Sequence, residues 1–487
     1  MSGALARRRD TSPGVVVPPA SPAPQARPAG VERPVPTLLR DTRPELADDI
    51  ALPPPRGFLR RLGKSPRMMH YNRLAALVLV VNAVVLAGHL TGGLWAQRAS
   101  AVVDTLSTLV VVNLTIAVVI RQHYVINLLF WLATRAPTHW PLTIRWTLAK
   151  VYHFGGIHVG GTIAATLWFA GLVGSLVVYA ARGTSPVALA TFAVAAAILA
   201  VLGVIIFTAL PSRRAKHHDQ FERVHRLGGW LSLLLFWALT ISLTNDLRGD
   251  AGLAAALVAS PELWLLVVVT FSVALPWLRL KKVPIELVRP SSHVALTRFD
   301  YGVTPFAGSS TALSRNPLLE WHSFANIPSP DRPGFRLAIS RSGDWTGSFI
   351  DDAPSHIWVK GIPTAGVANI EVLFKRVVYV ATGSGIGPVL PHLLAREVPS
   401  RLVWSTRSPY RTYGHALVDE ILAVQPDPII WDTDLQGTPD LVKLAYKVYR
   451  ELDAEAVIVI ANKKLTWRVV EAMEIRGIPA YGAIWDS

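Results

Sequence analysis

Long apolar runs separated by short basic loops fill the sequence from residue 74 to residue 278. A bilayer core is roughly 30 Å thick, and about 20 residues of helix cross it. The pattern therefore predicts six membrane-spanning helices. They are expected at Leu74–Leu90, Ala101–Ile120, Val151–Ala180, Val187–Leu210, Leu227–Leu243 and Ala254–Leu278.

The hydrophobic pattern changes after Lys282, where long apolar runs give way to short β-branched and aromatic runs. Strands are expected at Val294–Arg298, Phe335–Ile339 and His356–Val359, as in a small β-barrel or sandwich. From residue 372 onward, strand-like runs alternate with helix-like segments, which is typical of a doubly wound parallel sheet. Its strands are expected at Val377–Ala381, Leu402–Ser405, Ile429–Trp431 and Ala456–Ile460, and its helices at Val389–Glu397, His415–Val424, Leu441–Leu452 and Thr466–Arg476.

The first 66 residues follow neither pattern. They hold 13 of the 36 prolines and no apolar run of signal-peptide length, so they are expected to form a disordered basic tail. The predicted domains are therefore a tail at 1–66, a transmembrane domain at 67–282, a β-barrel domain at 283–371 and an α/β domain at 372–487.

Composition supports the membrane interpretation. Hydrophobic residues make up 51% of the chain and charged residues 17%, and the mean hydropathy is +0.36. The net charge is +15, but the basic residues form no stripe with stacking aromatics, so nucleic acid is not an expected partner. The absence of cysteine excludes disulfides, cysteine-ligated zinc and iron–sulfur clusters.

Loop charges predict the orientation of the helices. The loops after the second and fourth spans and the segment after the sixth are rich in arginine and lysine, whereas the opposite loops hold only Arg98, Arg182 and Arg248. Because basic loops stay in the cytoplasm, both termini are expected to be cytoplasmic. Asp104 is the only acidic residue expected well inside a span, so no ion relay is evident.

A glycine turn follows the first strand of the α/β domain, in the stretch Thr382-Gly383-Ser384-Gly385-Ile386-Gly387-Pro388. Glycines let the backbone turn tightly and approach a phosphate, and the N-terminus of the next helix attracts negative charge. At this position in a doubly wound sheet the turn predicts a dinucleotide site; the alternative is a plain tight turn.

Three motifs resemble the ferric reductase and NADPH oxidase superfamily. They are Trp321-His322-Ser323-Phe324-Ala325-Asn326-Ile327, Gly343-Asp344-Trp345-Thr346-Gly347 and the glycine turn. The resemblance implies a ferredoxin-reductase-like module that binds FAD and NAD(P)H. Departures are Ala325 in place of Thr or Ser, Lys360-Gly361-Ile362-Pro363 in place of Gly-Pro-Tyr-Gly, and Ala461-Asn462-Lys463 in place of Cys-Gly-Pro.

The chain also resembles the TmpA-like group of integral membrane proteins, regarded as flavin- and nicotinamide-binding oxidoreductases. The carrying stretches are Gly155-Gly156-Ile157-His158, Lys360-Gly361-Ile362-Pro363-Thr364-Ala365-Gly366 and the ending Arg476-Gly477-Ile478-Pro479-Ala480-Tyr481-Gly482-Ala483-Ile484-Trp485-Asp486-Ser487.

The resemblances imply cofactor contacts at specific residues. His322, Phe324 and Asn326 would contact the flavin, and Trp485 would stack on its isoalloxazine or else pack in the core. The pyrophosphate would lie against Thr382, Gly383, Ser384, Gly385 and Gly387. Arg407, which follows the second strand, is either a partner for a 2′-phosphate or a solvated loop arginine.

Histidines near the predicted cytoplasmic ends of the spans are candidates for a metal centre, because imidazoles in a membrane are often functional. A second stacked haem would need histidines 13 or 14 residues beyond His153 and His225. Those positions hold Thr166, Leu167, Ala238 and Leu239. A single inner haem between His158 (or His153) and His225 is one hypothesis. Interfacial hydrogen bonding and a quinone-like or lipid pocket are the alternatives.

The leading hypothesis is a membrane oxidoreductase that passes electrons from NAD(P)H through FAD to an unknown acceptor at the inner leaflet of the lipid bilayer. The alternative is a non-catalytic membrane sensor or scaffold with a degenerate nucleotide-binding module.

Overall fold

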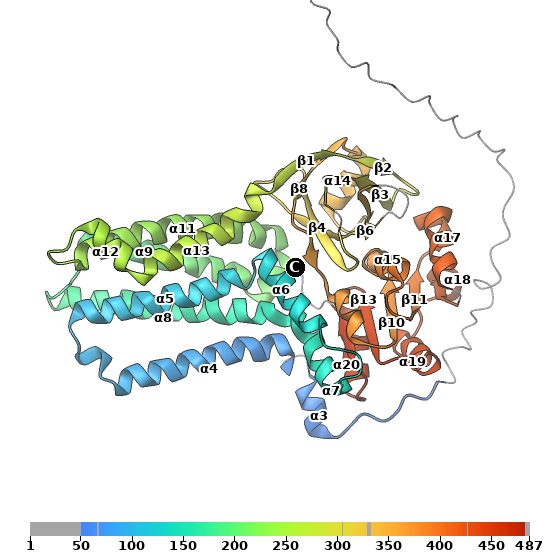
Figure 1. The fold of residues 1–487 in the computed structure, drawn as a ribbon, viewed down its shortest axis with the longest axis horizontal. Coiled ribbons are helices and arrows are strands. Elements are labelled where there is room, and N and C mark those ends of the chain that lie inside the picture. The colour runs from blue at the N-terminus through green and yellow to red at the C-terminus, as the bar shows by residue number, and fades with distance from the viewer. Residues whose placement is uncertain (1–49, 66–67, 304, 329–332, 426, 483–487) are drawn as a thin grey trace, which may run out of the picture. The chain divides into compact units, whose positions relative to one another are not determined.

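The computed structural model describes residues 50–65, 68–303, 305–328, 333–425 and 427–482 (Figure 1). Most of the predicted tail lies outside these residues, and so does Trp485. Within the tail range, residues 50–65 are described and include helix α3 (Phe58–Gly63). The backbone of this segment contacts the α/β domain, because Arg56 N–H donates to the Ile475 carbonyl oxygen at 2.9 Å.

Six helical segments in the described part of the chain are long and apolar enough to cross a membrane. They correspond in order to the six predicted spans. The third is a continuous segment built from α7 (Leu142–Leu148), η3 (Ala149–Phe154) and α8 (Gly155–Ala181). The other five are α4 (His70–Thr91), α5 (Ala99–Val119), α9 (Leu189–Ala209), α11 (His218–Leu247) and α13 (Pro261–Leu278).

Short helices that the hydrophobic pattern did not separate connect these segments. The predicted sixth span begins too early, because α12 (Leu253–Ala259) is a helix of its own and Ser260 caps the start of α13. The others are η2 (Leu94–Ala96), α6 (His123–Thr134) and α10 (Pro211–Lys216).

Glycines on α8 allow neighbouring helices to approach closely. A Cβ at Gly156 would lie 2.1 Å from the carbonyl oxygen of Tyr71, and one at Gly160 would lie 2.8 Å from that of Ala75. Small residues serve this purpose in membrane helix pairs, where close backbone approach stabilises packing. The structure uses Gly156 and Gly160 for close helix packing against α4.

The segment that follows the bundle folds into two antiparallel sheets, and the described strands do not close into a barrel. The predicted barrel is thus corrected to a pair of open sheets, with strands β3, β7 and β8 at the expected places. One sheet has the order β1-β8-β4-β5 with β9 beside β4, and the other has the order β2-β3-β7-β6. Their bounds are β1 Leu280–Pro284, β2 Glu286–Val288, β3 Val294–Phe299, β4 Ser309–Ser314, β5 His322–Ala325, β6 Ile327–Pro328, β7 Phe335–Ser340, β8 His356–Lys360 and β9 Thr364–Ala365, with helix α14 at Asp344–Asp352 after β7.

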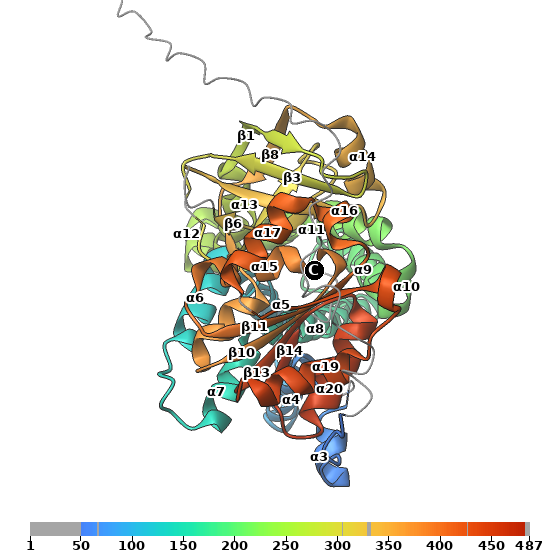
Figure 2. The same cartoon turned by 90° about the vertical axis from the view of Figure 1, so that its right-hand side faces the viewer.

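The C-terminal part forms the predicted doubly wound sheet, entered through η4 (Val367–Leu373). Its five parallel strands have the order β12-β11-β10-β13-β14. Figure 2 shows α15 and α17 on one side of this sheet and α19 and α20 on the other. The strands are β10 Val377–Thr382, β11 Ser400–Thr406, β12 Ile429–Asp432, β13 Ala456–Ile460 and β14 Ala480–Gly482; the helices are α15 Ile386–Ala395, α16 Pro409–Tyr413, α17 His415–Val424, α18 Thr433–Gln436, α19 Leu441–Glu451 and α20 Lys463–Glu474.

The strand order reverses between β10 and β13, since the chain first adds β11 and β12 on one side and then β13 and β14 on the other. Sheets of this kind bind ligands outside the carboxyl ends of the strands at this switch point. The fold therefore places the glycine turn, which follows β10, at the expected position for a ligand.

Candidate dinucleotide site

The glycine turn after β10 depends on two glycines for different reasons. Gly383 has φ +49°, in the left-handed region that favours glycine, and its carbonyl oxygen accepts a 3.0 Å hydrogen bond from Trp404 Nε1. Gly385 packs so closely on β13 that a Cβ there would lie 2.0 Å from the Ile460 carbonyl oxygen. The turn is therefore fixed between two neighbouring strands.

A cavity of about 740 Å³ opens beside this turn. Thr382 and Gly383 line it from the end of β10, and Asn462 lines it from the end of β13. His293, from the two-sheet domain, also reaches it. The predicted contacts Ser384, Gly385 and Gly387 are not among the residues that line the cavity. Ser384 is exposed, whereas Gly385 and Gly387 are buried in packing.

Arginines give the cavity a positive wall. Arg407 follows β11 as predicted, Arg411 lies on α16 and Arg468 lies on α20. Among the described residues, the guanidinium groups of Arg407 and Arg468 have no ion-pair or hydrogen-bond partner, whereas Arg411 lies 3.5 Å from the Asp434 carboxylate. Two unpaired guanidinium groups beside a glycine turn form a site suited to phosphate.

Local hydrogen bonds hold the arginine-bearing loop in place. The Asp432 carboxylate accepts from the backbone N–H of Ser408 at 2.9 Å and of Asp434 at 3.0 Å, so it caps α18 rather than facing a ligand. Tyr413 forms part of the cavity wall, and burial raises the pKa of its phenol. The tyrosine is therefore a neutral element of the wall.

The expected flavin residues lie on β5 and directly after it. His322 and Phe324 are half-buried, and the Trp345 ring stacks on both of them, with centroid distances of 4.2 Å and 5.9 Å. The Trp345 indole N–H donates to Glu320 Oε1 at 2.6 Å. Asn326 is fully buried and donates to Ser309 Oγ at 2.9 Å, while its side-chain oxygen has no partner among the described residues.

Flavin binding by His322, Phe324 and Asn326 stays a prediction, because their contacts in this structure are with protein groups. The predicted flavin residue His322 and the Trp345 ring of the Gly-Asp-Trp-Thr-Gly segment pack on each other. Burial lowers the pKa of His322 despite the nearby Glu222 and Glu320. Ala325 supplies no hydroxyl.

Comparisons with known proteins point to reductases. Residues 367–487 match the family described as adenylate-forming reductase 03009, C-terminal domain. The chain is 42% identical to adenylate-forming reductase 03009 of Coprinopsis cinerea over 426 residues, which cover 86% of this chain and 40% of that protein. It is 43% identical, with the same coverage, to adenylate-forming reductase 06235 of the same organism. The chain thus spans about 40% of the length of these relatives.

Two solved structures are distantly similar. A ferredoxin NADP+ reductase from Neisseria gonorrhoeae with bound FAD and NADP is 14% identical, with TM-score 0.35, and the match covers 42% of this chain and 98% of that one. A flavohemoglobin from Malassezia yamatoensis with bound FAD and heme is 16% identical, with TM-score 0.37, covering 60% of this chain and 85% of that one. These likenesses are too distant to assign a cofactor to this chain.

The candidate haem ligands do come together. The rings of His158 and His225 lie 6.1 Å apart at 73°, and His158 Nδ1 lies 2.8 Å from the Ala117 carbonyl oxygen. However, α4 already covers Gly156 and Gly160, so the glycine face of α8 does not supply a flat slot for a macrocycle. A single haem stays a prediction.

Arg411 and Arg468 were missed by the sequence analysis, and so was the cavity role of Asn462. Arg468 follows the glycine turn by more than 80 residues in the sequence, and only the return of β13 beside β10 brings α20 to the cavity. The sequence signal that could have found Asn462 was its place just after β13. The carboxyl ends of parallel strands share one edge of a sheet, so residues after β13 are expected near the glycine turn.

Proposed function

We propose that this chain is the membrane-embedded, nucleotide-binding part of an NAD(P)H-dependent oxidoreductase. The observation that carries the proposal is the cavity at the switch point of the sheet, where the Gly383 turn faces the unpaired guanidinium groups of Arg407 and Arg468. The names of the relatives, adenylate-forming reductases, support a reductive reaction.

The six long apolar helices support a place in the lipid bilayer, and the excess of basic residues near Arg145 and Arg214 supports cytoplasmic termini. The α/β domain is joined to that basic side. Arg145 Nη1 donates to the Leu373 carbonyl oxygen at 2.8 Å and pairs with Glu455 at 2.6 Å. The dinucleotide would then bind next to the cytoplasmic face.

Each group in the cavity has a distinct role in this proposal. The turn at Thr382 and Gly383 would receive the pyrophosphate. Arg407 and Arg468 would hold the 2′-phosphate and a neighbouring phosphate, so NADPH would bind more tightly than NADH. Asn462, at the end of β13, would hydrogen-bond near the nicotinamide end. The electron acceptor remains unassigned.

FAD supplies hydride acceptance and one-electron transfer wherever it is bound. The closed stack of Trp345 on His322 favours a second candidate function, a membrane sensor or scaffold that binds the nucleotide without a flavin. The two candidates differ in what Trp345 does. It either moves aside for a flavin or permanently replaces it.

The test uses the full chain purified in detergent, with absorption spectra recorded before and after addition of FAD. NADPH binding is measured by calorimetry, and turnover is followed by reduction of a dye. Retained flavin with dye reduction supports the oxidoreductase. NADPH binding without flavin supports the sensor. A protein that binds neither NADPH nor flavin overturns the proposal.

Two variants of Trp345 sharpen the choice. Trp345→Ala removes the ring that covers His322, whereas Trp345→Phe keeps a ring on that face. If a closed stack excludes flavin, FAD binding should appear in the alanine variant and stay absent in the phenylalanine variant. Equal flavin binding by wild type and both variants would show that the stack does not control the site.

A further inference from the structure

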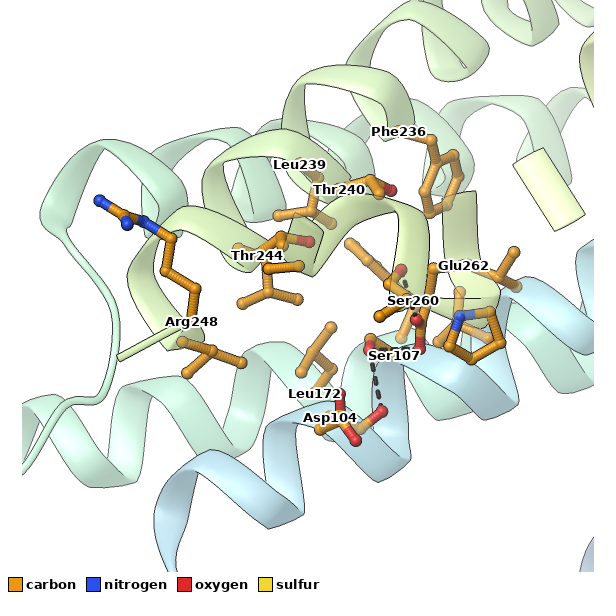
Figure 3. A pocket seen from close by; sticks show the side chains of 18 residues that line it. Asp104, Ser107, Leu172, Phe236, Leu239, Thr240, Thr244, Arg248, Ser260 and Glu262 are labelled. Carbon is orange, nitrogen blue, oxygen red and sulfur yellow. Dashed lines mark hydrogen bonds between the residues drawn. The ribbon is translucent and has the colours of Figure 1, made fainter. Parts of the chain in front are cut away.

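A second cavity, of about 320 Å³, lies within the helix bundle (Figure 3). Its wall is built from α5, α8, α11 and the start of α13. Asp104 lies near the beginning of α5, and the end of α5 leads to α6, where Asn127 hydrogen-bonds to the backbone of residues 363 and 365. The cavity is therefore at the end of the bundle remote from the dinucleotide site.

Two carboxylates line this cavity, and they differ in their surroundings. Glu262 is 7% exposed and accepts hydrogen bonds from the hydroxyls of Ser107, Thr108 and Ser260. Asp104 is exposed at the cavity, and its carboxylate has no hydrogen-bond or ion-pair partner among the described residues. The sequence analysis passed over Glu262, although it belongs to the predicted sixth span.

No cationic side chain in the described part of the chain neutralises these two groups. Arg248 stands at the rim of the cavity in Figure 3, but its guanidinium donates to Asn245 Oδ1 at 3.2 Å and to the Ala251 carbonyl oxygen at 2.5 Å. Glu262 is withdrawn from water without a counterion, which is unfavourable for a carboxylate, and the exposed Asp104 adds a second negative charge beside it. A cation from outside the chain would supply the missing charge.

The rest of the wall is suited to an apolar body. Phe169 and Phe236 meet edge to face with ring centroids 5.5 Å apart, and both line the cavity together with leucines of α8 and α11. Thr240 is more than nine-tenths buried, lines the same cavity, and its hydroxyl has no hydrogen-bond partner among the described residues. Aromatic faces and a free hydroxyl both accept an ammonium group.

We propose that this cavity binds an organic ammonium ion with an apolar body, whose charge lies between Asp104 and Glu262 and whose body lies against Phe169 and Phe236. The volume is at the lower end of small-molecule sites, which start at about 300 Å³. A bare metal ion fits less well, because the described residues contain no group of three or more histidine, cysteine or acidic side chains. In addition, both oxygens of Glu262 already accept hydroxyl protons.

This inference is independent of the proposed reductase activity, because none of its residues lines the dinucleotide cavity. It concerns the opposite end of the helices, and it holds whether or not the chain binds NADPH or a flavin.

The test measures binding of benzyltrimethylammonium to the full chain in an uncharged detergent by isothermal titration calorimetry. The neutral probe N,N-dimethylbenzamide has a similar size, and calcium chloride tests a bare cation. Asp104→Asn is the decisive variant, because its carboxylate has no internal hydrogen bond to lose and the fold is expected to persist. Glu262→Gln is the second variant, and Asp250→Asn removes an exposed charge outside the cavity as the matched control.

The ammonium probe should bind at least about tenfold more tightly than the neutral probe, since a charge-assisted contact is lost in the latter. Asp104→Asn should weaken binding by a similar factor, while Asp250→Asn should leave it unchanged. Equal binding of both probes, calcium binding that displaces the ammonium probe, or wild-type affinity in Asp104→Asn would each overturn the proposal.

Discussion

Lys150 of the third long apolar segment forms a buried ion pair with Glu474 of α20. Glu474 also lies 3.1 Å from Lys64 Nζ and accepts a 3.1 Å hydrogen bond from Trp146 Nε1. The same junction continues at β14, where the Tyr481 hydroxyl donates to the Trp146 carbonyl oxygen at 3.2 Å. One carboxylate thus joins the helix bundle to the α/β domain.

Glu474→Leu is expected to destabilise the protein strongly, because it leaves the Lys150 ammonium buried without a counterion. Breaking one side of such a pair typically lowers the free energy of unfolding by about 3–5 kcal/mol. The melting temperature in detergent is the measurement. The double variant Lys150→Met with Glu474→Leu should recover much of the loss, and Glu471→Gln on the same helix is the control. A double variant as unstable as the single one would contradict this explanation.

The junction should also depend on pH. Burial opposes ionisation of Glu474, but Lys150 and Lys64 outweigh it and hold the pKa of the carboxyl below its usual range. A carboxyl with a depressed folded-state pKa contributes stability above the usual value of about 4.5, and this contribution is lost as pH falls through the lower folded-state pKa. The wild type should therefore lose melting temperature in acid more steeply than the double variant does.

Arg407 and Arg468 should govern binding of the 2′-phosphate. Arg407→Gln and Arg468→Gln are each expected to weaken the binding of 2′-phospho-ADP-ribose by about tenfold or more, since each removes a charge-assisted contact. Binding of ADP-ribose should change much less in the variant that loses the 2′-phosphate partner. Arg450→Gln, on an exposed part of α19, is the matched control. Equal losses for both ligands would place the arginine at the pyrophosphate instead.

Two glycines of the turn, Gly385 and Gly387, should respond differently to a methyl group. A Cβ at Gly385 would overlap the Ile460 carbonyl oxygen, whereas one at Gly387 would meet Ala338 at ordinary distances, 3.5 Å from its carbonyl oxygen and 3.7 Å from its Cβ. Gly385→Ala is expected to lower the free energy of unfolding by about 1–3 kcal/mol, as in other overpacked sites, and to abolish nucleotide binding. Gly387→Ala should be tolerated. Thermal unfolding measures the stability of each variant, and calorimetry measures its nucleotide binding. An unstable Gly387→Ala would show that this helix turn cannot accommodate a methyl group.

Local patterns predicted much of this fold. The six long helices and the strands β10 to β13 follow from the hydrophobic periodicity, because a span or a buried parallel strand is apolar along its own length. The glycine turn was placed correctly for the same reason, as it directly follows a buried strand. Whether the antiparallel strands close into a barrel or form open sheets was not predictable. It depends on pairing between distant segments, such as β1 with β8.

The candidate sites were harder to predict, because their members come from separate elements. Trp345 follows the predicted flavin motif by 23 residues, and only the packing of α14 onto β5 reveals that its ring covers His322. Glu262 accepts from Ser107, 155 positions away. In both cases the residue types were visible in the sequence, but their contacts arise from tertiary packing.

Lys360 provides a final test, at the contact between the two-sheet domain and the bundle. Its ammonium lies 4.5 Å from the ring centroid of Trp321, and burial, with Arg226 nearby, lowers its pKa to about 8. Between that value and the usual value of about 10.5 the unfolded chain binds more protons, so stability should rise with pH across this window. Lys360→Met should melt higher than wild type at pH 7 and lose this rise, whereas Lys282→Met, at an exposed strand position, should keep it. A wild-type melting temperature with the same pH dependence as Lys360→Met between pH 8 and 10.5 would show that the ammonium is not buried at this contact.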